Sequence, residues 1–191
     1  LIHASYKGHK DIVEMLLNVG ANVNTKDNYG RTALIGACND AHIEIVRLLL
    51  DAGANINAMT NEKITALLVA VIHTNSDNVK KVDRSTEIVK MLLKEGADVN
   101  VKNENNRTAL QTVIASDGGW PDYGSDGSEE EDLTPKRKEI VELLIRYGAT
   151  IPSTKNENNR EELKRIKEAY SERHALTGVA IRLANTTPTT N

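Results

Sequence analysis

A ten-residue phrase recurs four times along this chain of 191 residues, and it limits the possible folds more than any other feature. The first two copies are 33 residues apart, the next two 43 and the last two 52, which fits a period of 33 with insertions of 10 and 19. A fixed period of this length predicts a repeat protein in which each unit packs on its neighbours. The four copies read "MLLNVGANVN", "LLLDAGANIN", "MLLKEGADVN" and, less closely, "LLIRYGATIP", with their glycines at Gly20, Gly53, Gly96 and Gly148.

Each unit predicts two helices joined by a turn. Before the first, short apolar helix stand Thr32, Thr65 and Thr108, whose hydroxyls suit helix N-caps. The second helix carries Leu, Ile and Val at amphipathic spacing. The glycine of the phrase follows it, where a left-handed residue ends a helix most easily. We therefore expect an all-α solenoid of stacked helix-turn-helix units.

The stretch from Gly30 to Ala58, "GRTALIGACNDAHIEIVRLLLDAGANINA", resembles the ankyrin repeat nearly throughout. The resemblance implies a solenoid with β-hairpin loops that binds a partner on its concave face, which the hairpins and first helices form. We expect an ankyrin-repeat domain over 1–174, with repeats at about 1–27, 28–60, 61–103 and 104–152 and a cap over 153–174. A C-terminal helix and tail would occupy 175–191.

The hairpins depart from the ankyrin pattern at one position. The usual glycine is kept only at Gly30, and its counterparts are Lys63 and Asn106. Asparagine tolerates a positive φ better than lysine does. We therefore expect the hairpin at Lys63 to be the strained or reshaped one.

Composition excludes several functional classes. The net charge of -3 does not favour nucleic acid, which needs a basic surface. No apolar run approaches the roughly 20 residues of a membrane span. The single cysteine, Cys38, cannot form an internal disulfide and fits a buried, inert thiol in an intracellular, cytoplasmic protein, although delivery into a host cell stays open. No metal-binding or phosphate-binding motif occurs, so we expect no catalytic site, metal or cofactor.

The partner-binding residues follow from the resemblance. Arg31 and Arg107 occupy equivalent places, with Ile64 between them in the row, so we hypothesise a partner with carboxylates or phosphates near an apolar spot. The alternative is that these are ordinary solvated residues. Trp120 could anchor a partner or pack against its own loop. The full set is Tyr6, Asn28, Tyr29, Arg31, Asn39, Asp40, Glu62, Ile64, Ile72, His73, Asn105, Arg107, Trp120 and Tyr123.

Both insertions fall between the two helices of their repeats, at about 74–84 and 117–134. Since adjacent repeats stack in register, we expect two loops that emerge side by side. Lys80, Lys81 and Arg84 would then face an acidic run in the second loop, and a cross-loop ion network could form. The alternative is a mobile, solvated acidic stretch.

Three residues are candidates for modification. Ser128 precedes three glutamates, and Thr134 precedes Pro135, so both resemble kinase sites. The alternative for Thr134 is an N-cap with proline in the first helical turn. Asn100 lies in a pattern that resembles the one hydroxylated in ankyrin repeats, whereas the structural alternative is a bond to the hairpin backbone.

The ends of the chain carry the remaining expectations. Leu1 aligns with Leu34, inside a helix, so we expect an exposed apolar face and either a fragment of a longer array or a parent protein that begins abruptly. A monomeric array is expected, and homotypic contact through that uncapped repeat stays open. Leu163 and Ile166 would line the inner face of a charged capping helix. Function is then a protein interaction module or scaffold; the alternative is the targeting region of a larger enzyme or secreted effector.

Overall fold

The computed structural model describes residues 1–75, 78–114, 135–151, 161 and 163–169. The chain divides into two compact units, Leu1–Pro152 and Ser153–Asn191. No strand occurs in the described part, so the all-α class is confirmed and the hairpins are loops without strand pairing. The elements are α1 (Ile2–Tyr6), α2 (Lys10–Asn18), α3 (Ala33–Asn39), α4 (Ile43–Asp51), α5 (Ala66–Ile72), η1 (His73–Asn75), α6 (Val79–Lys94), α7 (Ala109–Ile114) and α8 (Pro135–Arg146).

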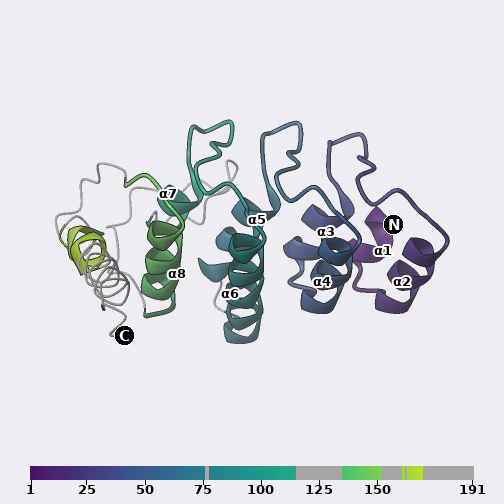
Figure 1. Cartoon of the computed structure of the whole chain (residues 1–191), viewed down its shortest axis with the longest axis horizontal. Coiled ribbons are helices and arrows are strands. Elements are labelled where there is room, and N and C mark those ends of the chain that lie inside the picture. Colours follow the sequence, from purple (N-terminus) through teal and green to yellow (C-terminus); the bar gives the residue numbers. More distant parts are fainter. Residues whose placement is uncertain (76–77, 115–134, 152–160, 162, 170–191) are drawn as a thin grey trace, which may run out of the picture. The chain divides into compact units, whose positions relative to one another are not determined.

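Within the first unit, the helices form antiparallel pairs that stack side by side (Figure 1). The first helices α1, α3, α5 and α7 contact one another in order, and so do the second helices α2, α4, α6 and α8. Leucines and isoleucines from both rows are fully buried between them, among them Leu34, Leu49, Leu67, Leu92 and Leu110. Each repeat therefore completes its core with residues of its neighbours, as the period predicted.

The threonines cap the first helices as predicted. The hydroxyls of Thr32, Thr65 and Thr108 each accept a hydrogen bond, at 3.3 Å, from the amide three residues later. In α7 the Gln111 side chain also accepts from the Thr108 amide at 2.9 Å, which completes a capping box. These bonds satisfy amides that a helix start otherwise leaves unpaired.

The second helices end at glycines with a positive φ, also as predicted. Gly53 has a φ of 79°, its amide donates to the Leu50 carbonyl at 2.9 Å, and the Ala54 amide donates to the Leu49 carbonyl at 2.9 Å. Gly20, Gly96 and Gly148 repeat this Schellman arrangement.

Among the residues that the structure describes, three other than glycine adopt a left-handed backbone: Lys63 with a φ of 58°, Asn106 with 60° and Ala41 with 55°. The Lys63 hairpin is strained but not reshaped, because its closing bond from the Thr60 amide to the Ile64 carbonyl, at 3.0 Å, matches those of the other hairpins. Ala41, in the turn between α3 and α4, was not anticipated from the sequence. The corresponding turn in the first repeat has Gly8.

From Val79 onward the first insertion is helical, so the loop predicted over about 74–84 is wrong there. The α6 helix has 16 residues, whereas α2 and α4 have nine each. Asn78 caps α6 by accepting from the Lys81 amide at 3.2 Å, and Val82 is buried, so the inserted residues continue the apolar face of the second helix. The second insertion, 117–134, and the proposed ion network with it, lie outside the described residues. Pro135 begins α8, as expected for proline in a first turn.

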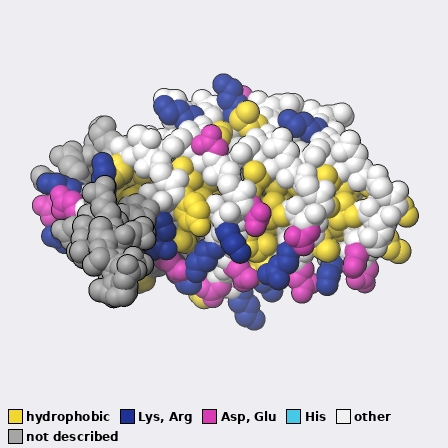
Figure 2. All heavy atoms as spheres, in the orientation of Figure 1, with side chains coloured by type: hydrophobic (Ala, Val, Ile, Leu, Met, Phe, Trp, Pro, Cys, Tyr) yellow, Lys and Arg dark blue, Asp and Glu magenta, His cyan; other side chains and the backbone are white. Residues whose placement is uncertain are grey.

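An apolar stripe is exposed on α2, where the sequence predicted an uncovered face. Ile12, Met15 and Val19 are 45%, 61% and 80% exposed. On the side away from the hairpins, side chains of both charges line the stack (Figure 2). Ion pairs also join neighbouring second helices, among them Lys10–Glu44 between α2 and α4 and Lys90–Glu139 between α6 and α8. None of the described helices is long and apolar enough to cross a membrane.

The described part of the second unit is a single helical stretch. Leu163 is buried and Ile166 is half-buried, while the charged residues between and after them are exposed. This agrees with the predicted polar outer face. The rest of the predicted cap and residues 175–191 lie beyond the part that the structure describes.

Candidate functional site

A groove of about 530 Å³ runs across the first three repeats, on the side of the hairpins and first helices. We call it the hairpin groove. Its apolar wall includes Ile35, Gly36 and Val69, and Thr60 and Asn61 complete the rim. Seven of the residues that the resemblance implied meet here: Tyr6, Tyr29, Arg31, Asn39, Glu62, Ile64 and His73. Residues far apart in sequence thus share one surface because the repeats stack in register.

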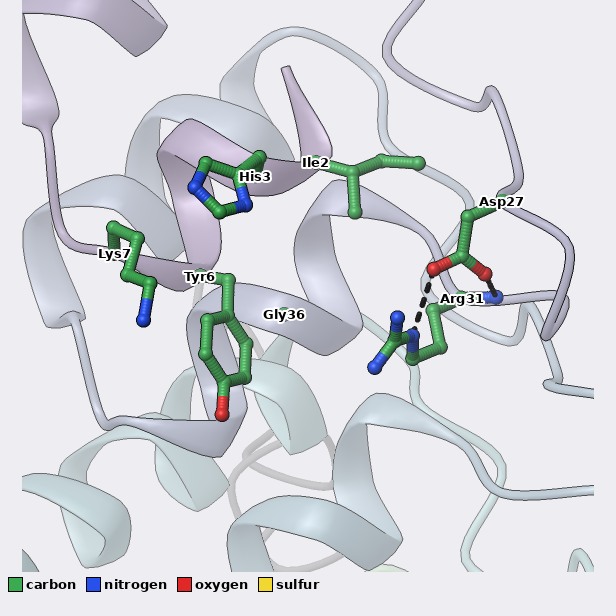
Figure 3. Close-up of a pocket in the computed structure, with 7 residues that line it drawn as sticks. All are labelled: Ile2, His3, Tyr6, Lys7, Asp27, Arg31 and Gly36. Atoms are coloured by element: carbon green, nitrogen blue, oxygen red, sulfur yellow. Dashed lines mark hydrogen bonds and ion pairs between the residues drawn. The ribbon is translucent and has the colours of Figure 1, made fainter.

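A second hollow of about 460 Å³ adjoins the hairpin groove and shares Tyr6, Arg31 and Gly36 with it. Figure 3 shows Tyr6 and Arg31 on either side of Gly36, with Asp27 paired to Arg31. Lys7 lies at this end, with its ammonium 5.3 Å from the centre of the Tyr6 ring. The two hollows therefore meet at Gly36, which lines both of them.

Arg31 is held within its own hairpin. Its Nε donates to Asp27 Oδ2 at 2.7 Å, while Asp27 Oδ1 accepts from the backbone amides of Tyr29 and Arg31 at 2.9 Å each. Burial would raise the pKa of Asp27, but these hydrogen bonds and the Arg31 charge together hold it below its ordinary value. The guanidinium carbon also lies 4.8 Å from the centre of the Tyr29 ring. Arg31 thus supports Tyr29, which is 68% exposed.

His73 is a neutral group of the groove. Its Nε2 lies 3.4 Å from Asn39 Oδ1. Burial and the charge of nearby Lys81 together lower the pKa of His73 to about 4, against the opposing charge of Asp40. Lys81 and Asp40 are themselves paired at 3.7 Å. At neutral pH the histidine therefore offers hydrogen bonds rather than charge.

Five of the sequence-predicted residues do not line the groove: Asn28, Asp40, Ile72, Asn105 and Arg107. The Asn28 carbonyl accepts from the Asn61 side chain at 3.0 Å, and the Arg107 amide donates to Asn103 Oδ1 at 3.0 Å. Arg31 and Arg107 therefore do not share this site. The remaining candidates, Trp120 and Tyr123, and the modification candidates Ser128 and Thr134, fall outside the described residues.

Asn100 links two repeats instead of its own hairpin, which corrects the structural alternative. Its Oδ1 accepts from the Thr150 amide at 2.9 Å, and its Nδ2 donates to the Gly148 carbonyl at 3.1 Å. Asn24 makes the equivalent bonds to Asn55 and Gly53. The side chain thus ties the turn after one second helix to the same turn in the next repeat. Whether Asn100 is hydroxylated stays a prediction.

Sequence reasoning missed two residues of structural consequence. Gly36 forms the groove floor, and the register of the repeats could have revealed it, since Val69 and Thr112 occupy the same place in the next two repeats. Arg137 is buried and donates from Nε to the Val113 carbonyl at 2.9 Å. A charged run at the start of α8 gave no signal of that burial.

Neither the cysteine nor the acidic and histidine residues form a reactive cluster in the described part. Cys38 is fully buried, and burial raises the pKa of its thiol, as predicted for an inert core residue. No group of three or more His, Cys, Asp or Glu side chains in that part of the chain could hold a metal ion.

A stack of helix pairs with an open groove beside its hairpins defines a repeat protein of the kind used for recognition. Residues 1–83, which include every residue of the hairpin groove, match the family model described as "Ankyrin repeats (3 copies)". Residues 1–83 are ankyrin repeats, and the resemblance seen in the sequence is confirmed there. Ankyrin repeats are in general protein–protein interaction modules and typically non-catalytic. No curated protein matches the chain.

Proposed function

We propose that this chain binds another protein through the hairpin groove. The observation that carries the proposal is Tyr29, which stays 68% exposed although Arg31 and Asp27 hold it in place. Aromatic residues in such positions are common anchors of interfaces, because they bury much area for little lost side-chain freedom. Tyr6 and Ile64 supply further apolar surface beside it.

The hairpins that carry these residues are connected to one another. The Asn61 amide donates to the Tyr29 carbonyl at 3.0 Å, and the Glu104 amide donates to the Glu62 carbonyl at 3.4 Å. A binding surface that is ordered before the partner arrives loses less conformational entropy on association. The backbone bonds between hairpins therefore favour recognition by this face.

Site-specific crosslinking tests the proposal. A photoreactive phenylalanine analogue placed at position 29 is expected to capture a partner protein, whereas the same analogue at Tyr147, an exposed tyrosine outside the groove, is expected not to. Tyr29→Ala and Ile64→Ala are each expected to weaken binding of that partner about tenfold or more. Equal capture from both positions, or unchanged affinity in both alanine variants, would contradict the proposal.

The finer expectations stay predictions. They are a scaffold role, an intracellular location, and service as the targeting region of a larger enzyme or secreted effector. The groove is compatible with the scaffold role and with the targeting role, because both need a protein partner.

A further inference from the structure

If the proposed function holds, the side chains of the hairpin groove indicate which residues a bound protein segment carries. We infer that the groove takes an extended protein segment in which a bulky apolar side chain stands beside a lysine or arginine. The apolar side chain would enter over Gly36, between Tyr6 and Ile35, and the basic side chain would reach Glu62.

The place for the apolar side chain is set by Gly36. Glycine is among the least favourable residues inside a helix, and α3 does not need it for packing. A Cβ built at Gly36 would lie 3.5 Å from Tyr6 Cβ and 3.6 Å from the Ile2 carbonyl oxygen, which are ordinary contacts. The glycine therefore lowers the floor of the groove without being required by the fold, and the walls around that floor are mainly apolar.

The place for the basic side chain follows from which charges are already paired. Arg31 is matched by Asp27 at 2.7 Å, and Asp40 by Lys81 at 3.7 Å. Glu62 lines the groove, is exposed, and has no ion pair within the described part of the chain. The unmatched charge of the groove is thus negative. This inference differs from the expectation of a carboxylate or phosphate partner, which rested on the equivalent places of Arg31 and Arg107 in the repeats.

A displayed library of random 12-residue peptides provides the probe. The whole chain would be panned in parallel with Glu62→Lys, Gly36→Val and the control Glu142→Lys, which alters an exposed glutamate of α8 outside the groove. Peptides that bind the unaltered chain are expected to share an apolar residue next to Lys or Arg. Selection on Glu62→Lys is expected to favour Asp or Glu instead, while Glu142→Lys selects the same peptides as the unaltered chain.

A synthetic peptide of the selected sequence then tests whether Gly36 makes room for the apolar side chain. Gly36→Val is expected to weaken its binding tenfold or more, and Gly36→Ala to weaken it less. Circular dichroism and thermal unfolding separate this effect from misfolding. Since alanine favours helix more than glycine does, Gly36→Ala is expected to unfold at the same or a higher temperature while it binds the peptide more weakly.

Two results would overturn the inference in different ways. Peptides whose binding is lost in Gly36→Val and Tyr29→Ala, but which lack a basic residue or ignore Glu62→Lys, would refute the partner chemistry and leave the proposed function standing. Peptides that bind Gly36→Val and Tyr29→Ala as well as the unaltered chain, or the selection of no peptide at all, would refute both.

Discussion

The left-handed backbone at Lys63 shows how single residues depart from the repeat at an energetic cost. An L-residue in this conformation costs roughly 1–2 kcal/mol, which glycine avoids. Lys63→Gly is therefore expected to raise the free energy of unfolding by about 1 kcal/mol, after allowance for the greater freedom of glycine in the unfolded chain. Urea unfolding followed by circular dichroism measures this change.

Gly30→Ala is the matched control for that substitution. A Cβ at Gly30 would lie 2.8 Å from the Asn61 backbone nitrogen, at a φ of 75°. This variant is therefore expected to be destabilised. A loss of stability in Lys63→Gly would show that the lysine side chain makes an important contact there.

The titration of His73 makes the stability of the folded chain depend on pH. Its pKa falls from an ordinary 6.5 to about 4 in the folded chain, so only the unfolded chain binds this proton between those values. Stability from His73 is therefore complete above pH 6.5 and is lost as the pH falls from 6.5 toward 4. We expect the urea midpoint of His73→Gln to decline less over this range than that of the unaltered chain. Parallel declines would show that carboxylates alone account for the change.

Some residues could be predicted from the sequence because the backbone alone sets their roles. The capping threonines and the terminating glycines depend on local geometry that each repeat shares. Arg31 could not be predicted in the same way. The position of Arg31 within the repeat places it at a hairpin tip. Only the folded turn shows that its guanidinium donates a hydrogen bond to the carboxylate of Asp27.

At the scale of helices, Arg137 joins α8 to the end of α7. Its side chain is buried and donates to the Val113 carbonyl. Arg137→Ala leaves that buried carbonyl without this donor, and we expect the free energy of unfolding to fall by about 2 kcal/mol. Lys136→Ala removes the exposed neighbouring cation and is expected to change stability little. Equal effects of the two variants in urea unfolding would argue against a special role for Arg137.

The α6 helix explains why an insertion was misread. The spacing of Gly53 and Gly96 indicates ten additional residues in this repeat, but it does not say whether those residues form a helix or a loop. The polar composition favoured a loop. The signals for helix were the cap at Asn78 and the apolar step from Val82 to Val89, which are weak beside so many charges.

Across the whole molecule, asparagines couple neighbouring repeats. Asn24, Asn57 and Asn100 each accept a hydrogen bond from a backbone amide of the next repeat, at 2.6, 2.8 and 2.9 Å. Since a solenoid unfolds as one unit only when its interfaces are strong, we expect the triple alanine variant to lose cooperativity. Its urea transition would have a lower midpoint and a lower m value.

A single alanine variant, Asn57→Ala, is expected to lower the midpoint by an amount equivalent to about 1 kcal/mol and to keep the m value. An unchanged m value in the triple variant would contradict this coupling.

The architecture as a whole could be predicted from the sequence because one interaction pattern is repeated. The hairpin groove could be predicted only in part. Stacking predicts which hairpin tips and helix faces come together, whereas the pairing of charges and the depth above Gly36 depend on side-chain contacts between repeats.

The two added turns of α6 have a mechanical consequence. Lys81 reaches back to Asp40 at the end of α3, and Asp83 reaches forward to Lys136 at the start of α8, at 3.7 and 3.1 Å. The α6 helix is thus tied by ion pairs to the repeats before and after it. Exposed ion pairs weaken as salt screens them. A rise in ionic strength is therefore expected to loosen the contacts of α6 with both neighbouring repeats and to let the stack bend more easily there.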